Sequence, residues 1–156
     1  MHRNHGNATR SRLRQATTAA LAAIAPLSLS HAADMPYRAV ADAIAEPLAP
    51  AGDAARGRQL ALDRNGGACV LCHALPETGA RFMGTMGPAL NGVGGRYTAG
   101  QLRLRIVDPT RLNPDAAMPA YYRSENLNDV ADPYRGRTIL TAQQVEDVVA
   151  YLVTLR

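Results

Sequence analysis

The sequence predicts a small all-α domain, on three observations. Thr98 and Thr141 are each followed three residues later by Gln, which is the capping-box signature of a helix start. After Thr141, apolar residues recur at helical spacing up to Leu155. No segment alternates strand and helix patterns. A chain of 156 residues with no Trp and one Phe is at most one small domain.

The first predicted helix begins at Gly52, with Asp53 as its N-cap, and is stopped by Asn65-Gly66-Gly67. It contains Gly57, although a glycine inside a helix costs about 1 kcal/mol relative to alanine. We therefore expect another helix to approach closely at Gly57.

The segment from Gly87 to Tyr97 is rich in glycine and holds a proline, which predicts a loop rather than regular helix. The second helix begins at Thr98, with Leu102 and Ile106 facing inward, and Pro109 closes it.

Residues 110–137 are polar and interrupted by prolines, and long loops of this kind are commonly functional or disordered. The helix after Thr141 is the best defined in the chain. Its apolar face is expected to cross the first helix near Gly57, through Val148, Tyr151 or Leu152.

The chemistry centres on Cys69-Val70-Leu71-Cys72-His73, which has the form of a covalent haem attachment site. Two thiols three positions apart on a helical turn can each add to one vinyl group of the porphyrin, and the following histidine then lies under the iron. Three other interpretations exist: a structural zinc site, a redox dithiol and two buried cysteines. Zinc needs more ligands than the processed chain offers, and a redox dithiol normally lies beside a strand-helix alternation. A porphyrin would also supply apolar bulk that the few aromatic residues do not.

Three residues of the glycine-rich segment are candidates for the haem pocket. An iron-bound histidine should donate its second N–H to an oxygen, and the carbonyl of Pro88 is our candidate acceptor. Arg96 and Tyr97 could donate to a haem propionate. The alternative is that both are solvent-facing loop residues.

The other axial ligand is sought among the methionines, because His73 is the only histidine left after the expected processing. Met35 lies in the tail, and Met83 and Met86 follow His73 too soon to reach the opposite face without a sharp fold. Met118 is far enough along the chain, and Pro119 stiffens its loop. The alternative for Met118 is a gap-filling core residue. His/Met ligation raises the reduction potential and closes the iron, which fits electron transfer.

Residues 1–32 have the composition of an export signal: four arginines without an acid, an apolar run, and small residues before Ala33. A mitochondrial presequence is the alternative. The sequence thus predicts a periplasmic protein, and no later stretch is long and apolar enough to span a membrane. Of seventeen basic residues four lie in this segment, while all thirteen acids follow it, so the mature chain has no net charge. Nothing in this balance favours nucleic acid as a partner.

The predicted mature chain has two parts, an extended arm over residues 33–51 and a monohaem domain over 52–156. The arm is rich in Ala and Pro and has no helical period. It is either a loose tail or a segment that binds a partner.

Taken together, the haem motif, the Gly-Pro-x-Leu loop, the Met-Pro loop and the C-terminal helix resemble class I cytochromes c. Several pieces more specifically resemble the X subunits of Sox sulfur-oxidation cytochromes, the SoxX family. These pieces are residues 52–58, 84–90, 118–122 and 139–152. The stretch 123–137 does not match residue by residue.

The resemblance implies a class I cytochrome c fold wrapped around one covalent haem c. It implies Cys69 and Cys72 as thioether anchors, His73 as the proximal iron ligand and Met118 as the distal one. It also implies that this chain forms a heterodimer with a larger cytochrome, SoxA. In that family, the SoxA subunit holds the site where thiosulfate is oxidatively joined to a cysteine of a carrier protein. This chain would be the non-catalytic electron-transfer subunit of that L-cysteine S-thiosulfotransferase, and would pass electrons to a soluble cytochrome c. The alternatives are a free-standing electron shuttle and a haem enzyme or gas sensor with an open iron.

Overall fold

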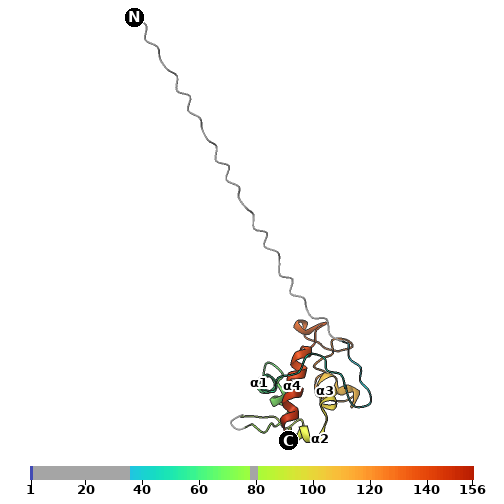
Figure 1. Ribbon diagram of the computed structural model, residues 1–156. Helices are drawn as coiled ribbons and strands as arrows, with labels where there is room; N and C mark the ends of the chain where they lie inside the picture. Colours follow the sequence, from blue (N-terminus) through green and yellow to red (C-terminus); the bar gives the residue numbers. More distant parts are fainter. Residues whose placement is uncertain (2–35, 78–80) are drawn as a thin grey trace. The chain divides into compact units, whose positions relative to one another are not determined.

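The computed structural model describes residues 1, 36–77 and 81–156, and the folded part is helical (Figure 1). The α-helices are α1 (Ala54–Leu62), α2 (Val93–Arg96), α3 (Ala99–Val107) and α4 (Ala142–Thr154). Three single 3₁₀ turns accompany them: η1 (Cys69–Leu71), η2 (Pro109–Arg111) and η3 (Asp132–Tyr134). Within these described ranges the only β pairing is one bridge between Val40 and Ala43, so the all-α prediction is confirmed.

The predicted export segment, residues 1–32, and Met35 lie outside the described residues, apart from Met1. In the part of the chain that the structure describes, no helix has both the length and the apolar character needed to cross a bilayer.

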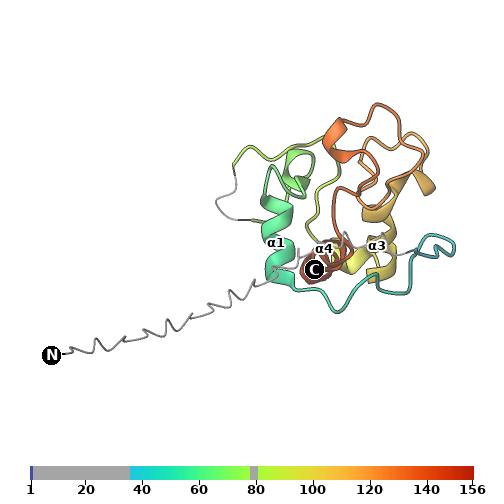
Figure 2. The same ribbon diagram turned by 90° about the horizontal axis from the view of Figure 1, so that it is seen from above.

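Helix α4 lies between α1 and α3, as Figure 1 shows and as the view along α4 in Figure 2 makes clear. Its buried apolar face is the predicted one, formed by Val145, Val148, Val149 and Leu152. This face packs against Ala61 of α1 and against the inner side of α3, which forms the core of the domain.

The backbones of α1 and α4 approach each other closely at Gly57. A Cβ atom at this position would overlap the carbonyl group of Asp147, so only glycine fits there. The predicted approach of a second helix is confirmed. Gly52 has the same role one turn earlier, against the carbonyl of Glu146.

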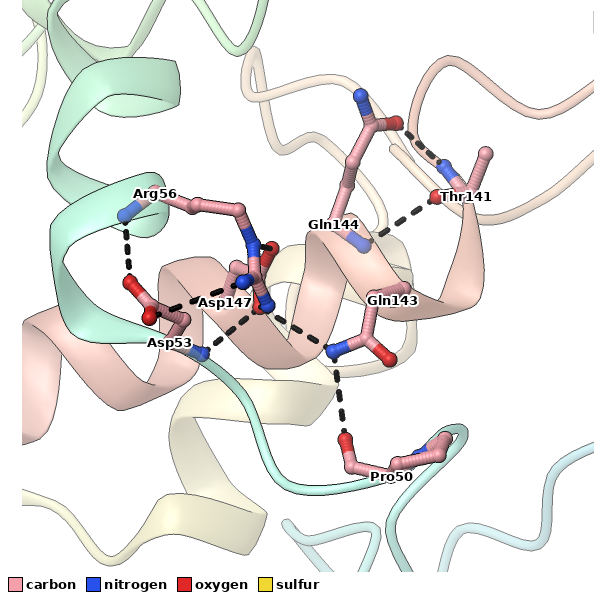
Figure 3. A network of polar contacts seen from close by, with 7 residues as sticks. All are labelled: Pro50, Asp53, Arg56, Thr141, Gln143, Gln144 and Asp147. Carbon is pink, nitrogen blue, oxygen red and sulfur yellow. Dashed lines mark hydrogen bonds and ion pairs between the residues drawn. The ribbon is translucent and has the colours of Figure 1, made fainter.

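Polar contacts close the edge of this crossing (Figure 3). The guanidinium of Arg56 donates to both carboxylate oxygens of Asp147, each at 2.8 Å, and the backbone N–H of Asp53 donates to Oδ1 at 2.8 Å. The Gln143 side chain bridges Asp147 and the Pro50 carbonyl. These contacts fix where α1 begins relative to α4.

Both predicted capping boxes are present. Thr98 accepts from the backbone of Gln101, whose side chain accepts from the Thr98 N–H, and Thr141 and Gln144 do the same at α4. Each box satisfies two backbone donors at a helix start, which explains why the sequence predicted these starts correctly.

Two predicted boundaries differ from the structure. Helix α1 ends at Leu62, before the glycines, and Gly67 instead donates its N–H to the Leu60 carbonyl at 3.0 Å. The glycine-rich segment, predicted to be loop throughout, contains the one-turn helix α2. Its Gly94 lies against the carbonyls of Leu152 and Val153 and donates to Leu155 at 2.8 Å. Packing on α4 therefore stabilises a turn that local propensity does not favour.

The N-terminal arm is docked, as its path from beside α3 to the start of α1 in Figure 2 shows. Ile44 and Leu48 are buried in the core. Ile44 donates its N–H to the Gly100 carbonyl at 3.0 Å, and the Leu48 N–H donates to the Glu146 carboxylate at 2.9 Å. The interpretation of this segment as a loose tail is wrong from Ile44 onward, because core residues hold it in place.

Candidate haem attachment site

The motif Cys69–His73 forms one tight turn after α1. The backbone N–H groups of Cys72 and His73 both donate to the Cys69 carbonyl, at 3.1 and 2.9 Å, and Ala68 before them has a left-handed φ of 55°. Both cysteines are free thiols, and both are half-buried. The two thiols therefore lie at the start and at the C-cap of a single 3₁₀ turn, and the imidazole follows directly after the second.

The chemistry of these thiols argues against one of the alternatives. Burial raises the pKa of the Cys69 thiol to about 11, whereas the attacking thiol of a redox dithiol has a lowered pKa. Among the described residues there is also no group of three or more His, Cys, Asp or Glu side chains that could hold a metal ion. The raised pKa of the Cys69 thiol therefore disfavours a redox dithiol.

The His73 ring is held from one side by the segment that the sequence singled out. Its Nδ1 lies 2.7 Å from the Pro88 carbonyl oxygen. Because a carbonyl only accepts hydrogen bonds, Nδ1 carries the proton and Nε2 carries the lone pair. A Cβ atom at Gly87 would overlap the ring itself, so glycine is needed where the chain passes under it. This arrangement fits an iron-binding imidazole, whose second nitrogen is fixed by an oxygen.

The loop after His73 is fastened to the attachment turn by backbone hydrogen bonds. Gly84 donates to the Val70 carbonyl at 2.9 Å, and Gly87 donates to the Cys72 carbonyl at 2.8 Å. Gly84 passes so close to the Leu71 carbonyl that a Cβ atom there would overlap it. Residues 84–87 are thus joined to the attachment turn by backbone contacts.

The three described methionines that the sequence weighed lie in different environments. Met86 is 77% exposed, and the Met83 sulfur accepts the Leu75 N–H at 3.2 Å. Met118 is half-buried against the core, in the loop between η2 and Tyr121. Its role as an iron ligand stays a prediction.

Tyr121 connects the Met118 loop to the attachment turn, a role that the sequence did not reveal. Its hydroxyl donates to the Gly67 carbonyl at 2.7 Å, and its N–H donates to the Ile106 carbonyl at 3.1 Å. Burial raises the pKa of Tyr121 to about 12, so the hydroxyl remains a donor. The only signal in the sequence was a tyrosine pair directly after Met-Pro, which does not indicate a partner.

Arg96 and Tyr97, the candidates for a propionate contact, have other partners in the structure. Arg96 donates to the carbonyls of Asn91 at 2.7 Å and Ala89 at 3.3 Å, within its own loop. The Arg105 guanidinium lies 4.1 Å from the centre of the Tyr97 ring. Their assignment to the haem pocket stays a prediction.

The fold is a small helical domain, and its site is a Cys-x-x-Cys-His motif whose histidine is held by a proline carbonyl. Together these features define a protein that binds haem covalently. The family model described as "Cytochrome c" matches residues 54–156. A chain in the crystal structure of SoxXA from P. pantotrophus is similar at 33% sequence identity and a TM-score of 0.70, covering 76% of this chain and 93% of that one. No curated protein matched the chain.

The chain therefore belongs to the cytochrome c family, whose haem c is bound covalently. The predicted fold class and the predicted cofactor are confirmed. The donor set described above fits this haem, with two thiols, one oriented imidazole and a glycine that leaves room for the ring.

Proposed function

We propose that this chain is the electron-transfer subunit of a periplasmic, two-cytochrome complex that oxidises thiosulfate. One observation carries the proposal: the likeness to a chain of SoxXA extends over 93% of that chain at 33% identity. The family-model match over residues 54–156 likewise includes the Met-Pro loop and the C-terminal helix, not the haem motif alone.

The residues have distinct roles in this proposal. Cys69 and Cys72 would form the two thioether bonds that hold the haem, and Nε2 of His73 would bind its iron. Met118 would supply a second iron ligand, its sulfur, from the loop that the Tyr121 hydroxyl joins to the Gly67 carbonyl. When bound, the haem accepts and releases one electron at a time. A methionine sulfur as the second ligand would raise the reduction potential and leave no coordination position open, which suits electron transfer better than gas binding.

The chain supplies no sulfur chemistry of its own in this proposal. It has two cysteines, and both are committed to haem attachment. The thiosulfate-oxidising site therefore belongs to a larger cytochrome of the SoxA type, which pairs with this chain and acts on a cysteine of a carrier protein. A soluble cytochrome c then takes the electrons. Residues 1–32 direct export, residues 33–51 form the arm, and residues 52–156 hold the haem.

The test is reduction of the haem in the native periplasmic fraction. We expect thiosulfate to reduce the haem, followed by visible absorption, only when a second cytochrome and a cysteine-bearing carrier are both present. The isolated mature chain should show no thiosulfate-dependent transferase activity. A monodisperse monomer that stays oxidised in every combination of fractions, yet exchanges electrons rapidly with an oxidase, would instead identify a free-standing shuttle.

A further inference from the structure

We infer that an ion pair between Asp108 and Arg123 closes the loop that carries Met118 and so controls how readily the iron becomes open to other ligands. The two residues are the ends of this loop. Asp108 is the C-cap of α3, and Arg123 comes five residues after Met118. The inference rests on the proposed role of Met118 as an iron ligand, and it adds the residues that position that side chain.

The middle of the loop has little hold on the domain. None of residues 111–119, all of which the structure describes, is buried, and Met118 is half-buried. The loop makes hydrogen bonds within itself, from Asn113 to the Pro109 carbonyl and from Ala116 to the Asn113 carbonyl, each at 3.0 Å. The place of Met118 is therefore set at the two ends of the loop, where the chain is attached to the buried part of the domain.

The two ends lie side by side because consecutive backbone N–H groups after the Met-Pro pair donate to consecutive carbonyls at the end of α3. The donors are Tyr121 and Tyr122 and the acceptors are Ile106 and Val107, at 3.1 and 3.2 Å. The next residue on one side is Arg123, and the next on the other side is Asp108. The backbone thus brings the two charges together at the base of the loop.

The ion pair links the two ends through a largely buried carboxylate. Nη1 of Arg123 donates to the two oxygens of Asp108, at 3.2 and 3.1 Å, and to the Thr110 hydroxyl at 2.9 Å. That hydroxyl in turn donates to Asp108 at 2.5 Å. The Asp108 side chain is 5% exposed and the Arg123 side chain 29%. Without Arg123 the carboxylate would be left buried and uncompensated, so the closed loop would lose stability relative to an open one.

The contacts of Arg123 show that its charge matters more than its shape. The three hydrogen bonds named above all come from Nη1. The Nε atom is buried and has no hydrogen-bond partner among the described residues. The forked geometry that distinguishes arginine from lysine is therefore not used by this pair. Lysine should be able to replace Arg123, whereas glutamine, which carries no charge, should not.

The test measures opening of the loop in the haem-loaded mature chain, by amide hydrogen exchange of residues 109–120 and by binding of imidazole to the ferric iron. Arg123→Gln removes the cation. Asp108→Asn removes the carboxylate and keeps a residue that caps η2 equally well. We expect each to speed exchange in this segment about tenfold or more, because charged hydrogen bonds that resist opening are lost. The dissociation constant of imidazole should fall by a similar factor, since the open state becomes more populated.

Four comparisons separate closure of the loop from general stability. Exchange in α4 should stay at the wild-type rate in both variants. Arg123→Lys should keep exchange and imidazole binding within about twofold of wild type. Arg135→Gln removes an exposed ion pair with Asp132, three residues away, and should change neither measurement. The double variant of Asp108 and Arg123 should show less than the sum of the two single effects, because both act through one contact.

Two results would overturn the inference. One is wild-type exchange of residues 109–120 in Arg123→Gln. The other is faster exchange without tighter imidazole binding, because the loop would then open without freeing the iron. Neither measurement uses thiosulfate or a partner protein. Failure of thiosulfate to reduce the haem would therefore count against the proposed function alone, and an unaffected Arg123→Gln variant would count against this inference alone.

Discussion

At the scale of single residues, the orientation of the His73 imidazole is fixed by Gly87 and Pro88, which are adjacent to each other in the sequence. The Pro88 carbonyl oxygen can only accept a hydrogen bond, which selects the tautomer in which Nδ1 carries the proton and Nε2 the lone pair. Gly87 provides the space that the ring occupies. The orientation of the proposed proximal ligand is therefore built into this Gly-Pro pair.

Gly87→Ala should disturb this arrangement. The added methyl group would overlap the His73 ring, and overpacking of this kind costs roughly 1–3 kcal/mol. We expect a lower free energy of unfolding of the haem-loaded chain and a changed reduction potential, measured by urea denaturation and redox titration. Gly95→Ala is the matched control, because nothing lies within 4 Å of a Cβ atom there, and it should be neutral or stabilising. Equal effects at the two positions would contradict the role assigned to Gly87.

Met118→Ala tests the proposed distal ligand. We expect loss of the weak far-red absorption band of methionine bound to ferric iron and a lower reduction potential, because the sulfur that favours the reduced iron is removed. The ferrous variant should also bind carbon monoxide, unlike the wild type. Met86→Ala serves as the control, since that side chain is 77% exposed. A variant of Met83 or Met86 that loses the band instead would show that the wrong methionine was chosen.

At the scale of elements, the crossing of α1 and α4 positions the attachment turn that follows α1. At Gly57 the two backbones are so close that there is no room for a Cβ atom. Beside it, the Asp147 side chain, which is only 3% exposed, forms an ion pair with Arg56. The hydrogen bond from Arg56 lowers the pKa of the Asp147 carboxyl from its ordinary 3.8 to about 2. The carboxylate is therefore part of the helix contact and not a solvated surface charge.

The crossing should weaken in acid. Because the folded pKa lies below the unfolded one, the contribution of Asp147 is complete above about pH 4 and is lost as the pH falls toward 2. We expect Asp147→Asn to lower the free energy of unfolding by about 2 kcal/mol at pH 5, with the difference from wild type shrinking toward pH 2. Denaturant titrations at several pH values measure this. For Asp132→Asn, which removes an exposed ion pair with Arg135, the difference should stay below about 1 kcal/mol throughout. A pH-independent difference for Asp147→Asn would contradict the assignment.

At the scale of the whole molecule, the arm, α3 and α4 are joined by a buried ion pair. The Arg103 guanidinium donates to both oxygens of Glu146, at 2.7 and 2.8 Å, and to the Ile44 carbonyl at 2.6 Å. Glu146 in turn accepts the Leu48 N–H. Both side chains are about 5% exposed, so the pair forms a polar centre inside the domain that also fastens the arm.

Arg103→Met should release the arm. Removing one partner of a buried pair leaves an unpaired charge and typically costs about 3–5 kcal/mol. We expect a correspondingly lower free energy of unfolding and faster proteolytic cleavage between residues 36 and 51. The control, Arg135→Met at an exposed pair, should cost about 0–1 kcal/mol and leave the cleavage rate unchanged. If Arg103→Met behaved like this control, the pair would not hold the arm.

The helical fold, both capping boxes, the buried face of α4 and the attachment motif were predictable from the amino-acid sequence, because each depends on residues a few positions apart. The Pro88 contact was also predictable, since an iron-bound histidine is expected to donate its second ring N–H to an oxygen. Only the tertiary structure decided that the arm is docked, that α2 forms, that Tyr121 reaches Gly67, and that Arg103 and Glu146 are buried together. Each of these depends on groups that lie far apart in the chain, up to 98 residues for Leu48 and Glu146. Charged or glycine-rich segments carry no local signal of such partners, and a buried charge is stable only where the fold brings its counterpart to it.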